Sequence, residues 1–130
     1  MRDKARAIAT VIMACVCAVL GNGPALSAYP ERPIRLMVSF PPGGSSDAMA
    51  RIVQPGLERL LGQPIIIENR AGAGGMLAID VVAKAAPDGY LIGLGGAGAL
   101  GTNLALQEKM PYDPRKDVAP VSGLAGSPLA

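Results

Sequence analysis

The chain has 130 residues with 12 lysines and arginines, 10 aspartates and glutamates, and no histidine. Its two cysteines, Cys15 and Cys17, lie in an apolar amino-terminal stretch, so residues 29–130 contain neither thiol nor imidazole. This excludes the usual transition-metal ligands and histidine-assisted nucleophilic catalysis. The whole formal charge of +2 comes from residues 1–28, and the neutral remainder gives no indication of a nucleic-acid partner.

Residues 1–28 have the three parts of a secretory signal peptide: a basic start, an apolar stretch over residues 7–20, and a final run rich in small side chains. A membrane span takes about 20 apolar residues, so this stretch is too short to cross a bilayer. We therefore predict a cleaved signal peptide over residues 1–28 and a periplasmic protein, with cleavage after either Ser27 or Ala28. The residues before Cys15 resemble a lipoprotein processing site, but they come too early in the apolar stretch.

The first strand and helix of the exported part follow an extended, proline-rich lead-in. Apolar side chains alternate along residues 34–39, which predicts a β-strand, and Pro41 and Pro42 end it. A helix is predicted over residues 46–61, with Gly62 as its stop. Apolar spacing assigns five residues to its buried face and three charged residues to its solvent face: Met49, Ile52, Val53, Gly56 and Leu60, against Arg51, Glu58 and Arg59.

The turn between this strand and helix, the first loop (residues 41–47), is a candidate ligand site. Gly43 and Gly44 allow positive φ and close backbone approach, and Ser45 or Ser46 is expected to cap the helix. The first turn of a helix leaves amide groups without partners and carries a partial positive charge, so an anion fits there. Asp47 either holds this loop or contacts the ligand. The alternative is an ordinary strand-to-helix turn.

A second strand and loop repeat this arrangement. Residues 65–68 are short and apolar on both faces, which is typical of a central parallel strand, and a helix is predicted over residues 76–85. The second loop (residues 69–75) lies between them and is rich in glycine. Its candidate ligand-binding residues are Gly72, Ala73, Gly74 and Gly75.

The third strand, predicted over residues 90–94, leads into a glycine-rich third loop (residues 95–101) that contributes Gly96 and Ala97 to the candidate site. The run from Gly93 matches the dinucleotide pattern G-x-G-x-x-G twice, but the long helix and the acidic residue that such a site needs do not follow. We therefore predict no cofactor. A short helix over residues 102–109 and a last strand over residues 118–124 complete the predicted elements.

Three strands alternating with helices predict an α/β fold with a parallel sheet. In such open sheets ligands bind beyond the carboxyl ends of the strands. We therefore expect the first, second and third loops to meet at one edge of the sheet and to form one site. No metal ligand set and no catalytic residue is predicted there.

Several short stretches, taken in order and spacing, resemble the Bug-type solute-binding receptors of tripartite tricarboxylate transporters, and together they cover nearly all of residues 29–130. These stretches are Tyr29-Pro30, Phe40-Pro41-Pro42-Gly43-Gly44, Leu61-Gly62-Gln63-Pro64, Glu68-Asn69-Arg70 with Gly72 to Gly75, Pro87-Asp88-Gly89-Tyr90, and Pro111-Tyr112-Asp113-Pro114. Ala71 departs from the proline that is common in the family, and the third loop is richer in glycine than usual.

The resemblance implies a type II periplasmic binding protein, in which two α/β domains close like a Venus flytrap over a small di- or tricarboxylate. It implies no catalysis and no cofactor, a monomer, and membrane permease subunits as partners. Ligand contacts in the family come largely from backbone amides and small polar side chains of the first domain. Because family members are much longer, residues 29–130 are expected to be part of that first domain, in an amino-terminal fragment. Alternatives are a small secreted carboxylate-based enzyme and a nonfunctional gene fragment.

Overall fold

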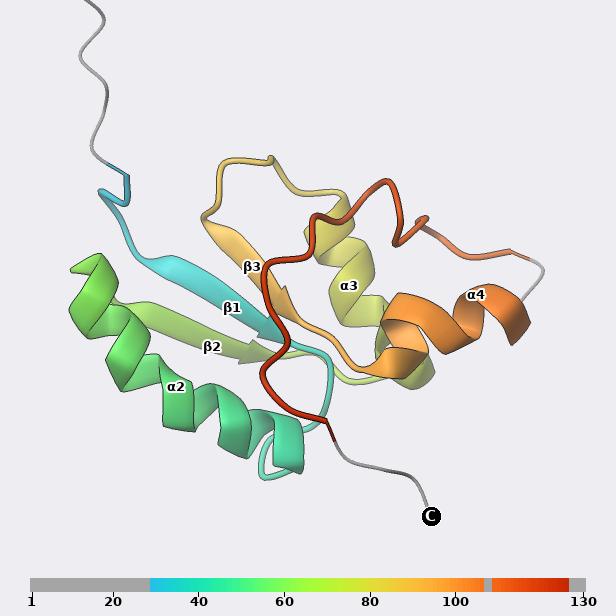
Figure 1. Ribbon diagram of the computed structural model, residues 1–130, viewed down its shortest axis with the longest axis horizontal. Coiled ribbons are helices and arrows are strands. Elements are labelled where there is room, and N and C mark those ends of the chain that lie inside the picture. Colours follow the sequence, from blue (N-terminus) through green and yellow to red (C-terminus); the bar gives the residue numbers. More distant parts are fainter. Residues whose placement is uncertain (1–28, 107–108, 127–130) are drawn as a thin grey trace, which may run out of the picture.

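The computed structural model describes residues 29–106 and 109–126 (Figure 1). The predicted signal peptide falls on residues 1–28, outside the described residues. No helix in the described ranges combines the length and the apolar character that crossing a membrane requires.

The core of the fold is a three-stranded parallel sheet (Figure 1). Its strands are β1 (Ile34–Val38), β2 (Ile65–Asn69) and β3 (Leu91–Leu94). The order is β2-β1-β3, and β1 pairs in parallel with both neighbours. The prediction of a parallel α/β fold is thereby confirmed, and all three strands point their carboxyl ends the same way.

Helices connect and cover the strands. The first is α2 (Ser45–Leu61), which lies on one side of the sheet. The 3-10 turn η1 (Ala73–Gly75) leads into α3 (Met76–Ala83) on the other side. After β3, the π-helical turn η2 (Gly98–Thr102) continues into the short helix α4 (Asn103–Leu106).

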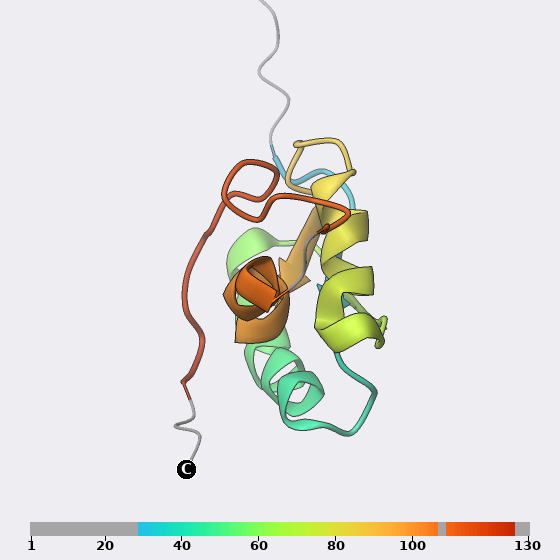
Figure 2. The same ribbon diagram turned by 90° about the vertical axis from the view of Figure 1, so that its right-hand side faces the viewer.

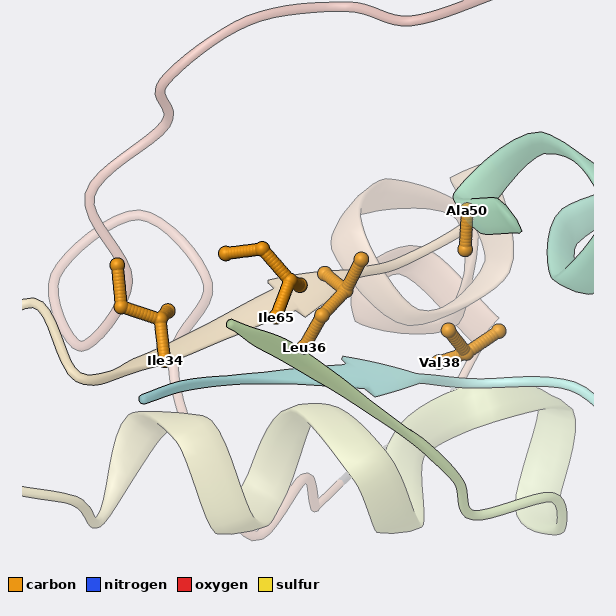
Figure 3. Close-up of a cluster of buried hydrophobic side chains, with 5 residues drawn as sticks. All are labelled: Ile34, Leu36, Val38, Ala50 and Ile65. Carbon is orange, nitrogen blue, oxygen red and sulfur yellow. The ribbon is translucent and has the colours of Figure 1, made fainter. Parts of the chain in front are cut away.

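Between the sheet and α2 lies a cluster of buried aliphatic side chains, shown in Figure 3. Ile34, Leu36 and Val38 point from β1 to this side because side chains alternate along a strand. Ala50 of α2 and Ile65 of β2 complete the cluster, with Leu57 and Leu61 of α2 packed against it. Full burial of such aliphatic side chains contributes about 1.5–3 kcal/mol each.

The predicted buried face of α2 is wrong at two positions, since Ile52 is 77% exposed and Leu60 is 84% exposed. The helix instead turns a partly polar face to the sheet. Gln54 donates to the Ile65 carbonyl oxygen at 2.8 Å, and the Glu58 carboxylate accepts from the Ile65 amide at 2.9 Å. Glu58, predicted to face solvent, is therefore half-buried. Apolar spacing did not predict this orientation of α2, because the hydrogen bonds that Gln54 and Glu58 form with Ile65 of β2 help to fix it.

A second cluster lies on the α3 side of the sheet. It is formed by Met76, Ile79, Ala99 and Tyr112, and the Tyr112 hydroxyl donates to the Ala99 carbonyl oxygen at 2.7 Å. A buried hydroxyl with a partner avoids the cost of an unsatisfied polar group. Tyr112 therefore ties the segment after α4 to the η2 turn.

The last predicted strand, over residues 118–124, does not form, and residues 118–126 run as irregular chain. Val121 is 93% exposed and Leu124 is 49% exposed, so neither side chain is buried. Pro120 has no amide to donate, and a strand without a hydrogen-bonded neighbour is not stable. The apolar residues of this segment suggested a strand, and the structure shows that they were not sufficient to predict one.

Candidate ligand site

The three loops meet at the carboxyl edge of the sheet, as predicted; this edge lies toward the right in Figure 1 and faces the viewer in Figure 2, with η2 and α4 in front. The side-chain amide of Asn69 donates to the Phe40 carbonyl oxygen at 3.1 Å and to the Asp47 carboxylate at 3.0 Å, which joins the second loop to the first. A Cβ atom placed on Gly75 would lie 3.1 Å from Ser39 Cβ and 3.5 Å from Ala99 Cβ. Gly75 therefore packs between the end of β1 and the η2 turn.

Asp47 holds the first loop in shape. Its Oδ2 accepts from the Gly43 amide at 3.0 Å and from Arg51 Nε at 2.9 Å, and its Oδ1 accepts from Asn69 at 3.0 Å. The hydrogen bond from Arg51, then those from Gly43 and Asn69, hold the pKa of Asp47 well below its usual range. Both carboxylate oxygens of Asp47 have partners within the protein. This favours the role of holding the loop over that of contacting the ligand.

The expected serine cap of α2 is wrong. The helix is capped by Gly44, and no side chain makes a capping hydrogen bond. Ser45 is already the first helical residue, and Asp47 reaches back to Gly43, as a capping side chain would. Within the described chain, no acceptor is found for the amides of Ser45 and Ser46, which remain available to an anion.

The second loop follows an unusual backbone path. Four consecutive residues have positive φ: Gly72 (132°), Ala73 (48°), Gly74 (63°) and Gly75 (90°). Ala73 is the non-glycine example among the described residues, and a left-handed conformation costs an L-residue about 1–2 kcal/mol. The path leaves the amides of Ala73 and Gly74 with no acceptor in the described ranges, whereas the Gly75 amide donates to the Gly72 carbonyl oxygen at 2.9 Å.

The third loop packs through Gly96 against Phe40, the residue just before the first loop. A Cβ atom there would lie 3.2 Å from the Phe40 ring, so only glycine allows this approach without displacement. Ala97 is exposed beside it. Gly93 and Gly95 also have packing reasons, since a Cβ atom on them would lie 3.2 Å or 2.9 Å from Ile79 Cδ1, whereas a Cβ atom on Gly101 would meet nothing within 4 Å. Packing thus accounts for the first dinucleotide-like match, since a Cβ atom on Gly98 would also lie 3.2 Å from the Gly74 carbonyl oxygen, but it does not account for Gly101.

Sequence reasoning missed Asn103, the first residue of α4. Its Nδ2 lies 3.1 Å from the position of a Cβ atom on Gly74, and the side chain is half-buried. Nothing in the local sequence marks this residue, because only the fold brings α4 beside the second loop. Asn103 thus lies beside the second loop.

The part of the site that the structure describes offers hydrogen-bond donors and no metal ligand set. The described residues contain no cluster of three acidic, cysteine or histidine side chains suited to a metal ion. Asp47, the acid of the first loop, forms an ion pair with Arg51 at 2.9 Å. A glycosidase-like pair would need two such acids across the site. The arrangement is suited to holding an anion by hydrogen-bond donors.

We expect the chain to lose stability in acid. The hydrogen bond from Arg35 lowers the pKa of Glu68, as the one from Arg51 lowers the pKa of Asp47. Carboxylates with a lowered folded-state pKa contribute stability above their unfolded value of about 4, and this contribution is lost as the pH falls below it. Thermal unfolding followed at decreasing pH should show this loss.

Asp47→Asn should reduce that acid dependence and lower the Tm at neutral pH by about 5 °C or more, because a side-chain NH2 would face the donors of Arg51 or Asn69. Glu31→Gln, which removes an exposed carboxylate, is the matched control. It should leave both the acid dependence and the Tm at neutral pH unchanged. Equal acid profiles for Asp47→Asn and the parent chain would contradict this role.

This parallel α/β sheet matches solved structures of periplasmic binding proteins. The structure of the periplasmic binding protein BugD matches this chain with a TM-score of 0.65 and 39% identity, over 68% of this chain and 29% of BugD. MatC from Rhodopseudomonas palustris with bound malate matches with a TM-score of 0.65 and 45% identity, over 68% of this chain and 30% of MatC.

The chain belongs to the tripartite tricarboxylate transporter family of receptors, whose model matches residues 49–130. Among curated relatives, protein BugT of Bordetella pertussis is 47% identical over 102 residues. The match covers 78% of this chain and 31% of BugT. The chain thus spans less than a third of the length of that relative, and the family resemblance seen in the sequence is confirmed.

Proposed function

We propose that this chain supplies ligand-binding loops of a periplasmic receptor that captures a small carboxylate for a tripartite tricarboxylate transporter. The observation that carries the proposal is the set of amides without acceptors in the described chain, at Ser45 and Ser46 on one side and at Ala73 and Gly74 on the other. Each pair precedes or begins a helix, where the dipole favours negative charge. MatC, which shares the fold, has malate bound.

The predicted site residues divide into two groups in this proposal. Ser45, Ser46, Ala73 and Gly74 offer amides to the ligand, and Gly96 and Ala97 line the third side. The remaining residues keep the loops in place: Gly43, Gly44, Asp47, Gly72 and Gly75. The receptor acts without catalysis, as a monomer, and its partners are the carboxylate and the permease subunits of the transporter.

The donors of these loops alone support weak binding. Helix-terminus interactions contribute about 0.3–2 kcal/mol each and a hydrogen bond about 0.5–1.5 kcal/mol net. A Kd of 1 mM corresponds to about 4 kcal/mol, and one of 1 μM to about 8 kcal/mol. We therefore expect millimolar affinity for a small dicarboxylate from the 130-residue chain.

Mapping by NMR tests this function. The chain is expressed with its own leader in a Gram-negative host, purified from the periplasm, labelled with 15N, and titrated with malate. The amides of Ser45, Ser46, Ala73 and Gly74 should shift together and saturate in the millimolar range, while the uncharged diamide of malate should shift none of them. Mass spectrometry of the purified chain should show cleavage after Ser27 or after Ala28.

An absence of shifts in malate, glutamate, citrate and terephthalate would overturn the proposed function. Shifts concentrated at the opposite edge of the sheet would do the same. Purification of an unprocessed, membrane-bound chain would contradict the periplasmic location.

A further inference from the structure

The turn before β3 contains the dipeptide Asp88-Gly89, at the amino edge of the sheet and opposite the candidate ligand site (Figure 1). Both carboxylate oxygens of Asp88 are bound. Its Oδ1 accepts from the Tyr90 amide at 3.0 Å, and its Oδ2 accepts from Arg32 Nη2 at 3.1 Å. Gly89 has a φ of 79°, which favours glycine at this position. The turn is thus held both by its own backbone and by the lead-in to β1, residues 29–33.

We call the contacts between the lead-in and this turn the amino-terminal clasp; its residues are Tyr29, Arg32, Asp88, Gly89 and Tyr90. The Tyr29 hydroxyl donates to the Gly89 carbonyl oxygen at 2.8 Å, and its ring lies edge-on to the Tyr90 ring, with 5.2 Å between centroids. The Arg32 guanidinium lies 4.1 Å from the centroid of the Tyr90 ring. The side chains of Arg32 and Asp88 are 64% and 43% exposed. Because exposed ion pairs contribute little and chain ends open readily, the clasp opens more easily than the sheet.

An aspartate that is followed by glycine reacts with its own main chain when the turn is free. The glycine nitrogen attacks the protonated side-chain carboxyl carbon, a C–N bond forms, and one water molecule leaves. The five-membered succinimide then takes up one water molecule and opens to aspartate or to isoaspartate. Glycine favours this ring closure because it has no side chain to obstruct the nitrogen. Within residues 29–130, no other aspartate or asparagine precedes a glycine.

We propose that Asp88 is a site of spontaneous isoaspartate formation and that the amino-terminal clasp controls the rate. The closed clasp holds the carboxylate on Arg32 and on the Tyr90 amide, so the carboxylate has to be released before the Gly89 nitrogen attacks it. Isoaspartate adds one carbon to the main chain and moves the carboxylate. The bond to the Tyr90 amide, next to the start of β3, is then lost, and the clasp stays open.

Peptide mapping by mass spectrometry measures this reaction. The exported chain is incubated in a mildly acidic buffer, in which more carboxyl groups are protonated, and is then digested. Isoaspartate has the mass of aspartate, so it is identified by its chromatographic shift and by the fragment ions of electron-transfer dissociation. We expect isoaspartate to accumulate at Asp88 and not at Asp117, which is exposed but is followed by valine.

Opening the clasp by mutation tests its control of the rate. Arg32→Gln removes the ion pair with Asp88 and should speed isoaspartate formation about twofold to fivefold. Tyr29→Phe removes the hydrogen bond to Gly89 and should also raise the rate. The matched control is Arg59→Gln, the same exchange at an exposed arginine on α2, which should leave the rate unchanged.

A synthetic peptide of residues 85–92, which lacks the lead-in, gives the rate without the clasp and should react faster than the chain. Hydrogen exchange separates opening of the clasp from unfolding, because unfolding of the whole chain would also expose the amides of β2. If Arg32→Gln does not fold, Tyr29→Phe gives the same comparison. Absence of isoaspartate at Asp88 in the chain while the peptide forms it would overturn the modification site. Equal rates in the parent chain and in the folded clasp variants would overturn the control by the clasp.

Discussion

Replacing Gly75 with valine should strongly destabilise the chain. Gly75 is buried with a φ of 90°, a region that L-residues rarely adopt and that β-branched residues avoid. The left-handed conformation alone costs about 1–2 kcal/mol. A side chain would also collide with the end of β1, since its Cβ would lie 3.1 Å from Ser39 Cβ and 3.3 Å from Ser39 Oγ. Overpacking of this kind costs about 1–3 kcal/mol more, a large part of a typical total of about 5–15 kcal/mol.

Gly62 provides the control for this variant. It has a φ of 69° at the end of α2, but a Cβ atom there would meet nothing within 4 Å. Gly62→Val therefore adds the backbone strain without the collision. Urea denaturation followed by circular dichroism should show a larger loss for Gly75→Val, and equal losses would mean that contact with Ser39 is unimportant.

The sheet and its loops could be predicted because their signals are local. Each strand is a short apolar run that stops at proline, asparagine or glycine, and parallel strands must place their carboxyl ends together. The boundaries of β1 and α2 agree with the predicted ones to within one residue. The meeting of the three loops followed from this topology alone.

Features that depend on contacts between distant residues could not be predicted in this way. The orientation of α2 is fixed by Gln54 and Glu58, whose partner is the backbone of Ile65. Apolar spacing assigned Ile52 and Leu60 inward because it does not register polar side chains that face a strand. Asn103 escaped notice for the same reason, since its neighbour Gly74 is far from it in the sequence.

Ile79 is the residue on which the packing of the glycine-rich third strand and loop depends. It is 1% exposed, and its Cδ1 lies 2.9 Å from the position of a Cβ atom on Gly95. We expect Ile79→Ala to cost about 2–5 kcal/mol in the free energy of unfolding, because it removes buried methylene groups and leaves a cavity. Ile66→Ala, the same exchange at a site that is 47% exposed, should cost clearly less in the same urea titration.

A double-mutant cycle tests why glycine stands at position 95. Gly95→Ala should destabilise the parent chain, since the new methyl group meets Ile79 Cδ1. In the Ile79→Ala background the same exchange should cost less or even stabilise, because the methyl group would fill part of the cavity. A non-additive energy of about 0.5–3 kcal/mol would be expected for residues in contact. Additive effects would show that contact with Ile79 is not the reason for glycine at position 95.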